Sequence, residues 1–334
     1  RYGIFSSQLR YKGDSLAQGN LLQVHFPRDT FYTVRLVAES DFGCKDSVEQ
    51  RIQAWPKPFP NFDIVDDAQC LRGNAFEFKE TGSLRAGSMQ HQWRFGDVSN
   101  TTTGGNAKHS YGTDGTFEVQ LRSESNNGCI DSVSKSVNVW PMSQAGFSMN
   151  DSTQCFRGNE VQFASTSLVK SGTLRYYWDF DDGGRDSGNT VRNKYGTYRL
   201  YNPKHWIITD KACGDTVQKE VYIYPMPVAD FAINDTGQCL NQQSFYFEDI
   251  SLIPTGTIQR TWTFFDSSST QTTITRSFPE DIRYEVRLIQ ESGFGCRDTA
   301  TKYITVYPKP EPDFSINDSD QCLRGNQFTF TNTS

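Results

Sequence analysis

Apolar and polar residues alternate along this chain in many short runs, each bounded by glycine, asparagine, aspartate or proline. Alternation with a period of two is typical of β-strands that bury one face. Between Pro225 and Pro308 the runs are Phe231-x-Ile233, Phe245-x-Phe247, Trp262-x-Phe264, Tyr284-x-Val286-x-Leu288 and Ile304-x-Val306. About seven short strands in about 84 residues is the pattern of an immunoglobulin-like sandwich. The second copy interrupts it with Asn202-Pro203, where we expect a strand to bend.

Eight cysteines show that this pattern is an internal repeat. Equivalent positions recur after 85, 84 and 83 residues, at Cys44, Cys129, Cys213 and Cys296. A second cysteine follows each of these after 26 residues, at Cys70, Cys155, Cys239 and Cys322. The sequence therefore predicts an all-β fold of tandem immunoglobulin-like β-sandwich repeats.

Aromatic-proline junctions mark the expected repeat limits. They read Trp55-Pro-Lys-Pro58, Trp140-Pro-Met142, Tyr224-Pro-Met-Pro227 and Tyr307-Pro-Lys-Pro310. We predict a C-terminal half-repeat at 1–57, complete repeats at 58–141, 142–226 and 227–309, and an N-terminal half-repeat at 310–334. The chain starts inside a repeat, so we expect it to be a fragment. Proline fixes the backbone angle φ, so these linkers should allow little movement between neighbouring repeats. The sequence therefore predicts an extended rod of very roughly 150 Å.

Composition and motifs exclude several functions. The net charge of −6 argues against nucleic acid, and no run of 18 apolar residues suggests membrane insertion. The four histidines, His25, His91, His109 and His205, occupy unrelated repeat positions. Catalytic and phosphate-binding motifs do not occur. We therefore expect neither catalysis nor a cofactor.

The cysteines are interpreted as structural disulfides. They form no Cys-x-x-Cys pair and have no histidines nearby, which disfavours zinc. The alternative, eight free thiols in a reducing compartment, leaves reactive cysteines in exposed turns. We therefore expect an oxidising compartment.

Strand direction predicts which cysteines pair. In a sandwich, the loop after the first strand and the last hairpin lie at opposite ends, about 20 Å apart, beyond the roughly 7 Å Cα limit of a disulfide. Head-to-tail repeats bring the exit end of one to the entry end of the next. We therefore predict the interdomain bonds Cys70–Cys213 and Cys155–Cys296, with partners outside the chain for Cys44, Cys129, Cys239 and Cys322. The competing intradomain pattern is Cys70–Cys129, Cys155–Cys213 and Cys239–Cys296.

Charged residues accompany these cysteines at fixed spacing. In each predicted disulfide, an arginine lies two residues after the first cysteine and an aspartate lies two residues after the second cysteine. This spacing predicts the junction ion pairs Arg72–Asp215 and Arg157–Asp298. Exposed pairs contribute only about 0–1 kcal/mol. The disulfides are therefore expected to dominate the junctions.

One acidic cluster is a candidate calcium site. Asp179, Asp181 and Asp182 lie beside Gly183 and offer carboxylate oxygens. The chain has no twelve-residue calcium loop, and the other copies lack the cluster. We favour a solvated turn and expect no metal.

Several motifs resemble the PKD domain, an immunoglobulin-like sandwich. They are Trp178-Asp-Phe-Asp-Asp-Gly183, Gly196-Thr-Tyr198 and His109-x-Tyr111. The other copies depart from the acidic turn, with Trp93-Arg-Phe-Gly-Asp97 and Trp262-Thr-Phe-Phe-Asp266. A function tied to that turn is therefore not shared by all copies.

The cysteine signature, as in Asn317-Asp-Ser-Asp-Gln-Cys322-Leu-Arg-Gly-Asn326, resembles tandem PKD repeats of giant SprB-like adhesins of gliding bacteria, exported by the type IX route. The resemblance implies a cell-surface location and a role in adhesion or gliding motility. Its implied partners are neighbouring repeats, surface polysaccharide and other motility proteins. Acceptors for O-glycosylation in the same bacteria are similar to the motifs at Ser47, Ser132, Thr216 and Thr299; the alternative is a polar start to the last strand.

Two functions remain open on this sequence. The first is a stiff stalk segment of a large extracellular adhesin. The second is a set of carbohydrate-binding or spacer repeats in a secreted polysaccharide-degrading protein. An exposed row of aromatics recurring in each copy would favour binding, whereas aromatics confined to cores and junctions favour the stalk.

Overall fold

The computed structural model describes residues 5–11, 14–18, 21, 23–99 and 102–334, and these residues form strands and loops without a helix. The predicted all-β fold of tandem immunoglobulin-like sandwiches is confirmed. None of the described segments is a helix that could span a membrane. Two compact units are described separately. One holds Arg1–Gln144, Leu168–Leu174 and Ile208–Asp215, and the other holds Ala145–Ser167, Arg175–Ile207 and Thr216–Ser334.

The first unit opens with a single four-stranded sheet in the order β2-β1-β3-β4. Its strands are β1 (Phe5–Tyr11), β2 (Asp14–Gln18), β3 (Phe31–Ser40) and β4 (Lys45–Gln53). β3 and β4 form an antiparallel hairpin in which Tyr32 lies opposite Ile52. This piece supplies one layer of a sandwich.

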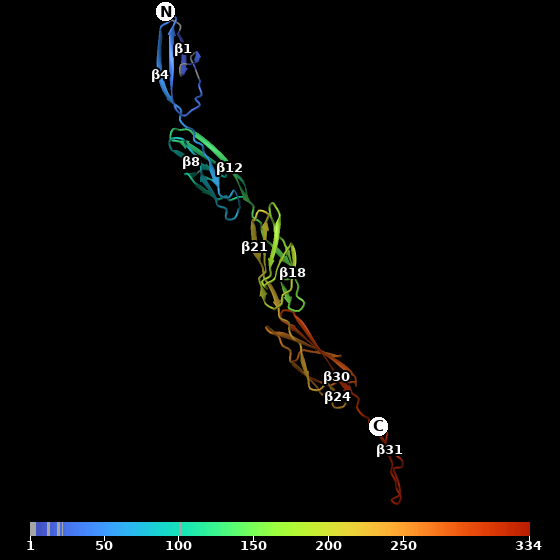
Figure 1. Ribbon diagram of the computed structural model, residues 1–334. Helices are drawn as coiled ribbons and strands as arrows, with labels where there is room; N and C mark the ends of the chain where they lie inside the picture. The colour runs from blue at the N-terminus through green and yellow to red at the C-terminus, as the bar shows by residue number, and fades with distance from the viewer. Residues whose placement is uncertain (1–4, 12–13, 19–20, 22, 100–101) are drawn as a thin grey trace. The chain divides into compact units, whose positions relative to one another are not determined.

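The first complete sandwich packs the sheet β10-β7-β5 against the sheet β6-β12-β11-β8-β9 (Figure 1). Its strands are β5 (Phe62–Ile64), β6 (Ala68–Cys70), β7 (Phe76–Glu80), β8 (Met89–Arg94), β9 (Thr102–Thr103), β10 (Ala107–His109), β11 (Gly115–Ser125) and β12 (Ile130–Trp140). The short strand β6 runs parallel to the end of β12, with Cys70 opposite Trp140. Parallel pairing thus carries Cys70 to the end where the chain leaves the sandwich.

The second sandwich differs from the first because each of its last two long strands is divided into two shorter ones. It comprises β13 (Phe147–Met149), β14 (Thr153–Cys155), β15 (Val161–Ser165), β16 (Leu174–Asp179), β17 (Arg185–Ser187), β18 (Thr190–Asn193), β19 (Leu200–Tyr201), β20 (Lys204–Thr209), β21 (Gly214–Gln218) and β22 (Val221–Tyr224). The sheets run β13-β15-β18, β14-β22-β19 and β17-β16-β20-β21. Asn202 and Pro203 separate β19 from β20, because proline cannot donate to the ladder. The predicted irregularity there is confirmed.

The third sandwich repeats the first. Its strands are β23 (Phe231–Ile233), β24 (Gly237–Cys239), β25 (Phe245–Asp249), β26 (Ile258–Thr263), β27 (Ser268–Ser269), β28 (Thr273–Arg276), β29 (Arg283–Ser292) and β30 (Arg297–Tyr307). They form the sheets β23-β25-β28 and β24-β30-β29-β26-β27. A two-stranded piece follows, made of β31 (Phe314–Ile316) and β32 (Phe330–Asn332). The repeat limits placed at the proline junctions stay a prediction.

Each complete sandwich has its own buried core around one tryptophan. Trp93, Trp178 and Trp262 are fully buried. Their indole N–H groups donate to the carbonyl oxygens of Gly104, Gly188 and Gln271 at 3.1, 2.9 and 2.8 Å. A buried tryptophan needs such a partner, and here the loop after its strand supplies one.

A buried histidine distinguishes the second core. The ring of His205 lies 3.9 Å from that of Trp178. Its Nδ1 donates to the carbonyl oxygen of Tyr177 at 3.0 Å, so Nε2 is left to accept the hydroxyl of Ser165 at 2.9 Å. Burial lowers the pKa of His205, and the hydrogen bond to Tyr177 opposes this only in part. His205 is therefore neutral in the folded state near pH 7.

This histidine makes the second sandwich sensitive to acid. Below about pH 6.5 His205 binds a proton in the unfolded chain but stays neutral in the folded chain. The free energy of unfolding therefore falls by up to about 1.4 kcal/mol for each pH unit. Urea unfolding at pH 7.5 and 5.5 measures the loss. His205→Gln, which keeps a polar side chain but cannot take up a proton, should remove it. An equal loss in that variant contradicts the role of His205.

Candidate functional site

Two disulfides join successive sandwiches and form the most distinctive site of the chain. Cys70 bonds to Cys213 with a Cα–Cα distance of 5.5 Å, across 143 residues of sequence. Cys155 bonds to Cys296 with a Cα–Cα distance of 5.6 Å, across 141 residues. The structure thus brings together both predicted pairs, and each bond links two different cores.

The loop that carries Cys70 is held by side chains of its own signature. The amide of Gln69 accepts from Ala75 N at 2.8 Å and donates to Ala75 O at 3.4 Å. The amide of Asn74 donates to Leu71 O at 2.7 Å and to Tyr111 O at 2.9 Å, and accepts from Tyr111 N at 2.7 Å. Glutamine and asparagine therefore fix the loop on both sides of the cysteine. Rigid presentation lowers the entropy cost of closing the bond.

The same clamps recur in the other sandwiches. Gln154 bonds to the backbone of Glu160, and Asn159 to that of Tyr195. The third copy has Gln243 where the others have asparagine. The Gln243 amide donates to Phe278 O at 2.6 Å and accepts from Phe278 N at 2.8 Å. The longer side chain preserves the clamp.

The partner cysteines lie in tight turns of the last hairpin. Cys213 N donates to the hydroxyl of Thr209 at 3.0 Å, and Cys296 N to that of Ser292 at 3.1 Å. The residue before the cysteine in the third copy, Gly295, has a φ of +82°, which glycine adopts without strain. In the second copy Ala212 takes the place of this glycine, directly before Cys213, with a φ of +60°. A hydroxyl and a left-handed residue therefore shape each turn.

Both predicted ion pairs form beside the disulfides. Arg72 Nη1 lies 3.1 Å from Asp215 Oδ1, and Arg157 Nη1 lies 2.8 Å from Asp298 Oδ1. Asp298 Oδ2 also accepts the backbone N–H of Ala229 at 3.0 Å, just after the proline junction. Burial alone raises the pKa of Asp298, but the hydrogen bonds from Arg157 and Ala229 outweigh it and hold the pKa below its usual value.

Removing the arginine should have a small effect on stability. Arg157→Ala is expected to lower the free energy of unfolding of the third sandwich by no more than about 1 kcal/mol, because the guanidinium is largely exposed. It should also raise the pKa of Asp298, as measured by NMR titration. Arg192→Ala, which breaks the exposed pair with Glu160, is the control and leaves that pKa unchanged. An unshifted pKa in Arg157→Ala would contradict the pairing.

A ring contact completes each joint, and the sequence did not reveal it. At the second joint the rings of Tyr224 and Phe294 stack at 4.1 Å with an interplanar angle of 7°. At the first joint Lys211 Nζ lies 5.2 Å from the ring centroid of Trp140. The signal was available: the aromatic lies before the junction proline, and its partner lies two residues before the bonded cysteine.

Four cysteines are thiols in the structure: Cys44, Cys129, Cys239 and Cys322. The Cys129 sulfur lies 3.9 Å from the carbonyl oxygen of Trp55. Asp131, which occupies the place of Asp215 and Asp298, pairs with Lys57 at 3.0 Å. That these cysteines have partners outside the chain stays a prediction.

The acidic turn uses its carboxylates separately. Asp179 bonds to Arg185 at 3.2 Å, Asp181 accepts Asn202 N at 3.0 Å, and Asp182 bonds to Gly184 N at 2.8 Å. The hydrogen bond from Asn202 lowers the pKa of Asp181. Within the described ranges, no three acidic, histidine or cysteine side chains are grouped to hold a metal ion.

The aspartate that ends each tryptophan motif has a structural partner. The pairs are Asp97–His109, Asp182–Asn193 and Asp266–Arg276, at 2.8, 2.7 and 2.8 Å. Each partner is the last residue of β10, β18 or β28. A side-chain contact thus holds the turn to a strand of the other sheet, and the partner residue differs in each copy.

The candidate modification sites share one property. The side chains of Ser47, Ser132, Thr216 and Thr299 are all exposed. They lie next to the aspartates of the joints. The four hydroxyl groups are therefore accessible to a modifying enzyme, and their O-glycosylation stays a prediction.

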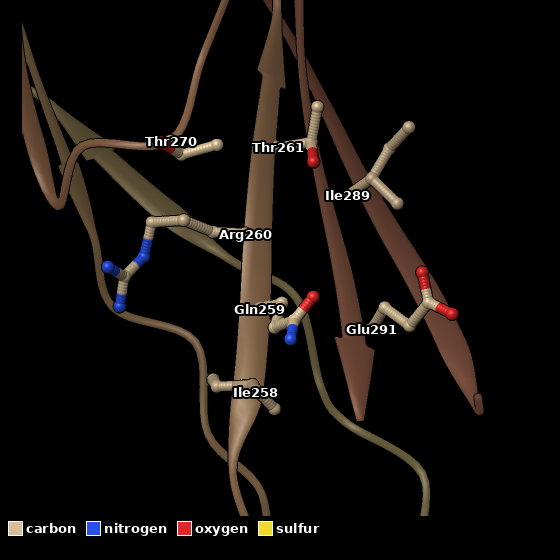
Figure 2. Close-up of a pocket in the computed structure, with 7 residues that line it drawn as sticks. All are labelled: Ile258, Gln259, Arg260, Thr261, Thr270, Ile289 and Glu291. Carbon is tan, nitrogen blue, oxygen red and sulfur yellow. The ribbon is translucent and has the colours of Figure 1, made fainter. Parts of the chain in front are cut away.

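The third sandwich has a hollow on its surface (Figure 2). It lies over β26 and β29 and is lined by Ile258, Gln259, Arg260, Thr261, Thr270, Ile289 and Glu291. Arg260 pairs with Asp249 at 2.7 Å, and Glu291 pairs with Arg297 at 2.9 Å. Since both charges have partners within the chain, we assign no ligand to this hollow.

The fold and the joints define a class: tandem immunoglobulin-like sandwiches linked by interdomain disulfides. A family model described as PKD domain matches residues 57–140, which hold the first complete sandwich. The match agrees with the motif resemblance for that copy. No curated protein matches the chain.

Solved structures show a general similarity of fold. The N-terminal eight Ig domains of Down Syndrome Cell Adhesion Molecule isoform 1.30.30 match with 10% identity and a TM-score of 0.44, over 94% of this chain and 45% of that chain. This chain thus spans less than half of that structure. Sidekick-1 immunoglobulin domains 1-4 match with 11% identity and a TM-score of 0.30, over 90% of each chain. A Ca2+-stabilized ice-binding adhesin of an Antarctic bacterium matches with 10% identity and a TM-score of 0.30, over 92% of this chain and 91% of that chain. With these scores, no function is transferred.

Proposed function

We propose that this chain is a structural stalk segment of a large extracellular bacterial adhesin. The observation that carries the proposal is the pair of disulfides between successive cores. A bond inside one sandwich stabilises that domain, whereas a bond across a junction also restricts motion between neighbours. The two described joints repeat the same bond and the same kind of ion pair, and each adds a ring contact of its own. Such repetition suits a spacer that must keep its length.

The finer assignment extends this proposal. The cysteine signature supports an SprB-like adhesin that serves surface attachment or gliding motility and is exported by the type IX route. The disulfides support an oxidising, extracellular location. The partners are then neighbouring repeats, surface polysaccharide and other cell-surface proteins.

The placement of aromatics favours the stalk over a carbohydrate-binding array. The three core tryptophans are fully buried. Exposed aromatics such as Tyr246, Phe265 and Tyr303 have no aromatic counterpart at the equivalent positions of the first sandwich, which are Glu77, Gly96 and Ser136. These exposed aromatics therefore do not form a row that recurs from copy to copy.

Small-angle X-ray scattering tests the proposal. The oxidised chain should give one narrow distribution of maximum dimension. A variant with serine at Cys70, Cys213, Cys155 and Cys296 should give a broader distribution with a smaller mean. Identical curves would remove the stalk proposal. Binding of soluble polysaccharides to both forms would instead favour the carbohydrate-binding function.

A further inference from the structure

The two described joints share one plan but differ in what holds them besides the disulfide. The first joint is closed by Cys70–Cys213 and the second by Cys155–Cys296. Each also has one ion pair between a largely exposed arginine and an aspartate. Because exposed ion pairs contribute little, the linker and the ring contacts decide how each joint behaves when its disulfide is open.

The linkers of the two joints differ at their fourth position. The first linker reads Trp140-Pro-Met-Ser143 and the second reads Tyr224-Pro-Met-Pro227. Proline fixes its own φ and also restricts the residue before it. Met226 lies between two prolines and is therefore restricted, whereas Met142 is followed by a serine. The first linker can thus bend at a residue that is constrained in the second.

Contacts on both sides of Met142 place the flexible point there. Trp140 is held in the first sandwich, because it lies opposite Cys70 in the pairing of β6 with β12. Ser143 is held in the second sandwich, because its hydroxyl donates to the carbonyl oxygen of Cys213 at 3.4 Å. Bending of the first linker is therefore confined to the short segment that contains Met142.

A cluster of three rings spans the second joint. Tyr224 stacks on Phe294 at 4.1 Å with an interplanar angle of 7°. Tyr222 extends the cluster, with its ring 4.5 Å from Tyr224 and 6.4 Å from Phe294. Two of these rings belong to the second sandwich and one belongs to the third. Aromatic contacts of this kind stabilise a fixed geometry, so they resist bending without the disulfide.

Polar residues take the places of the two outer rings in the first joint. Asn138 stands where the second joint has Tyr222, and its side chain accepts the hydroxyl of Thr116 at 2.8 Å within the first sandwich. Lys211 stands where the second joint has Phe294. Its half-exposed ammonium lies 5.2 Å from the ring centroid of Trp140 and 3.5 Å from Asp210. A flexible, solvated lysine holds the joint less firmly than a stacked ring.

We propose that the first joint is a redox-operated hinge, which is stiff while Cys70–Cys213 is closed and bends at Met142 when that disulfide is reduced. The second joint stays stiff when Cys155–Cys296 is open. This hinge goes beyond the stalk function, because it gives the two joints different behaviour. It lets the chain change its reach while every sandwich stays folded.

Reduction of the first joint requires a dithiol and leaves the backbone intact. A thiolate of the dithiol attacks the sulfur of Cys70, which is half-buried, whereas Cys213 is fully buried. The S–S bond breaks, and Cys213 leaves as a thiolate. The second thiolate of the dithiol then displaces Cys70 and closes a disulfide within the reductant. The two cysteine sulfurs gain two electrons and two protons, and the dithiol loses the same number.

Small-angle X-ray scattering of two variants of the full chain separates the joints. Their common parent has serine in place of the four cysteines that are thiols in the structure. Adding Cys70→Ser with Cys213→Ser should widen the distribution of maximum dimension as much as loss of both disulfides does. Adding Cys155→Ser with Cys296→Ser should leave it as narrow as in the parent. Equal widths in these two variants overturn the proposal.

Reversible switching is tested in the variant that keeps only Cys70–Cys213. Dithiothreitol should widen its distribution, and oxidised glutathione should restore the narrow one. The variant that keeps only Cys155–Cys296 is the matched control, and its wide distribution should not change with either reagent. A distribution that stays narrow after complete reduction of Cys70–Cys213, verified by mass spectrometry of alkylated thiols, contradicts the hinge.

Exchanging the residues that distinguish the joints should exchange their behaviour. Pro227→Ser with Phe294→Lys should widen the distribution of the variant without the second disulfide. Tyr303→Lys removes an exposed ring that contacts Arg283 and should leave that distribution narrow. Ser143→Pro with Lys211→Phe should narrow the distribution of the variant without the first disulfide. Widths that do not respond to these exchanges show that the linker and rings do not set the stiffness.

Hydrogen exchange separates bending from unfolding. Under the conditions of the scattering experiment, the cores around Trp93, Trp178 and Trp262 should stay protected in every variant. A wide distribution that appears only together with loss of protection in a core overturns the hinge, because unfolding then supplies the change in dimension.

Discussion

Replacing Cys155 and Cys296 together with serine is expected to lower the free energy of unfolding of the third sandwich by about 2–4 kcal/mol. When this sandwich unfolds in the oxidised chain, Cys296 stays tied to the folded second sandwich. The bond therefore restricts the unfolded state and favours the folded one. Hydrogen exchange with mass spectrometry in mild urea measures the loss for β29 and β30 separately.

The other joint supplies a matched control. Cys70→Ser with Cys213→Ser removes the same kind of bond and should leave exchange in β29 and β30 unchanged. It should instead accelerate exchange in the first and second sandwiches. Equal effects of both double variants on the third sandwich would show that the bonds do not act locally.

Trp262→Ala is expected to lower the free energy of unfolding of the third sandwich by about 3–5 kcal/mol. The indole is fully buried between Phe231, at a ring distance of 5.1 Å, and Phe264, at 6.2 Å. Its loss leaves a cavity and an unpaired carbonyl oxygen on Gln271. Urea unfolding followed by circular dichroism, with hydrogen exchange to assign the transition, measures the change.

Tyr303→Ala provides the comparison within the same sandwich. Tyr303 lies on β30, is 45% exposed and contacts Arg283. Its removal should cost less than about 1 kcal/mol, since little apolar area leaves the core. A similar cost for both variants would mean that core packing does not determine the stability of this sandwich.

The fold could be predicted because its signals are local and repeated. Period-two runs around each tryptophan define the strands, and Asn202-Pro203 marks the one strand that breaks. The pairing of the cysteines across the joints could be predicted from strand direction. In the structure, β6 runs parallel to β12 with Cys70 opposite Trp140, and this places Cys70 at the end where the chain leaves the sandwich.

The ring contacts of the joints were not predicted, because they depend on which side chains meet across a junction. The places of Tyr224 before the junction proline and of Phe294, 70 positions later, before the bonded cysteine bring the two residues to one joint, but do not by themselves show that their rings stack. A lysine contact also recurs in each complete sandwich. Lys135, Lys219 and Lys302 each lie over a core phenylalanine, Phe62, Phe147 and Phe231, at 5.0 Å. Such contacts require the register of distant strands.

The two disulfides interleave, since Cys155 lies inside the loop closed by Cys70 and Cys213, and this order sets how the chain responds to tension. While both bonds are intact, three backbone segments connect the first bond to the second in parallel: 70–155, 155–213 and 213–296. The shortest is the segment from Cys155 to Cys213, 58 residues (213 minus 155). When the sandwiches unfold, it limits the separation of Cys70 and Cys296 to a contour length on the order of 200 Å. The 143-residue loop closed by Cys70 and Cys213, with a contour length on the order of 500 Å, can be drawn out in full only after a bond is reduced.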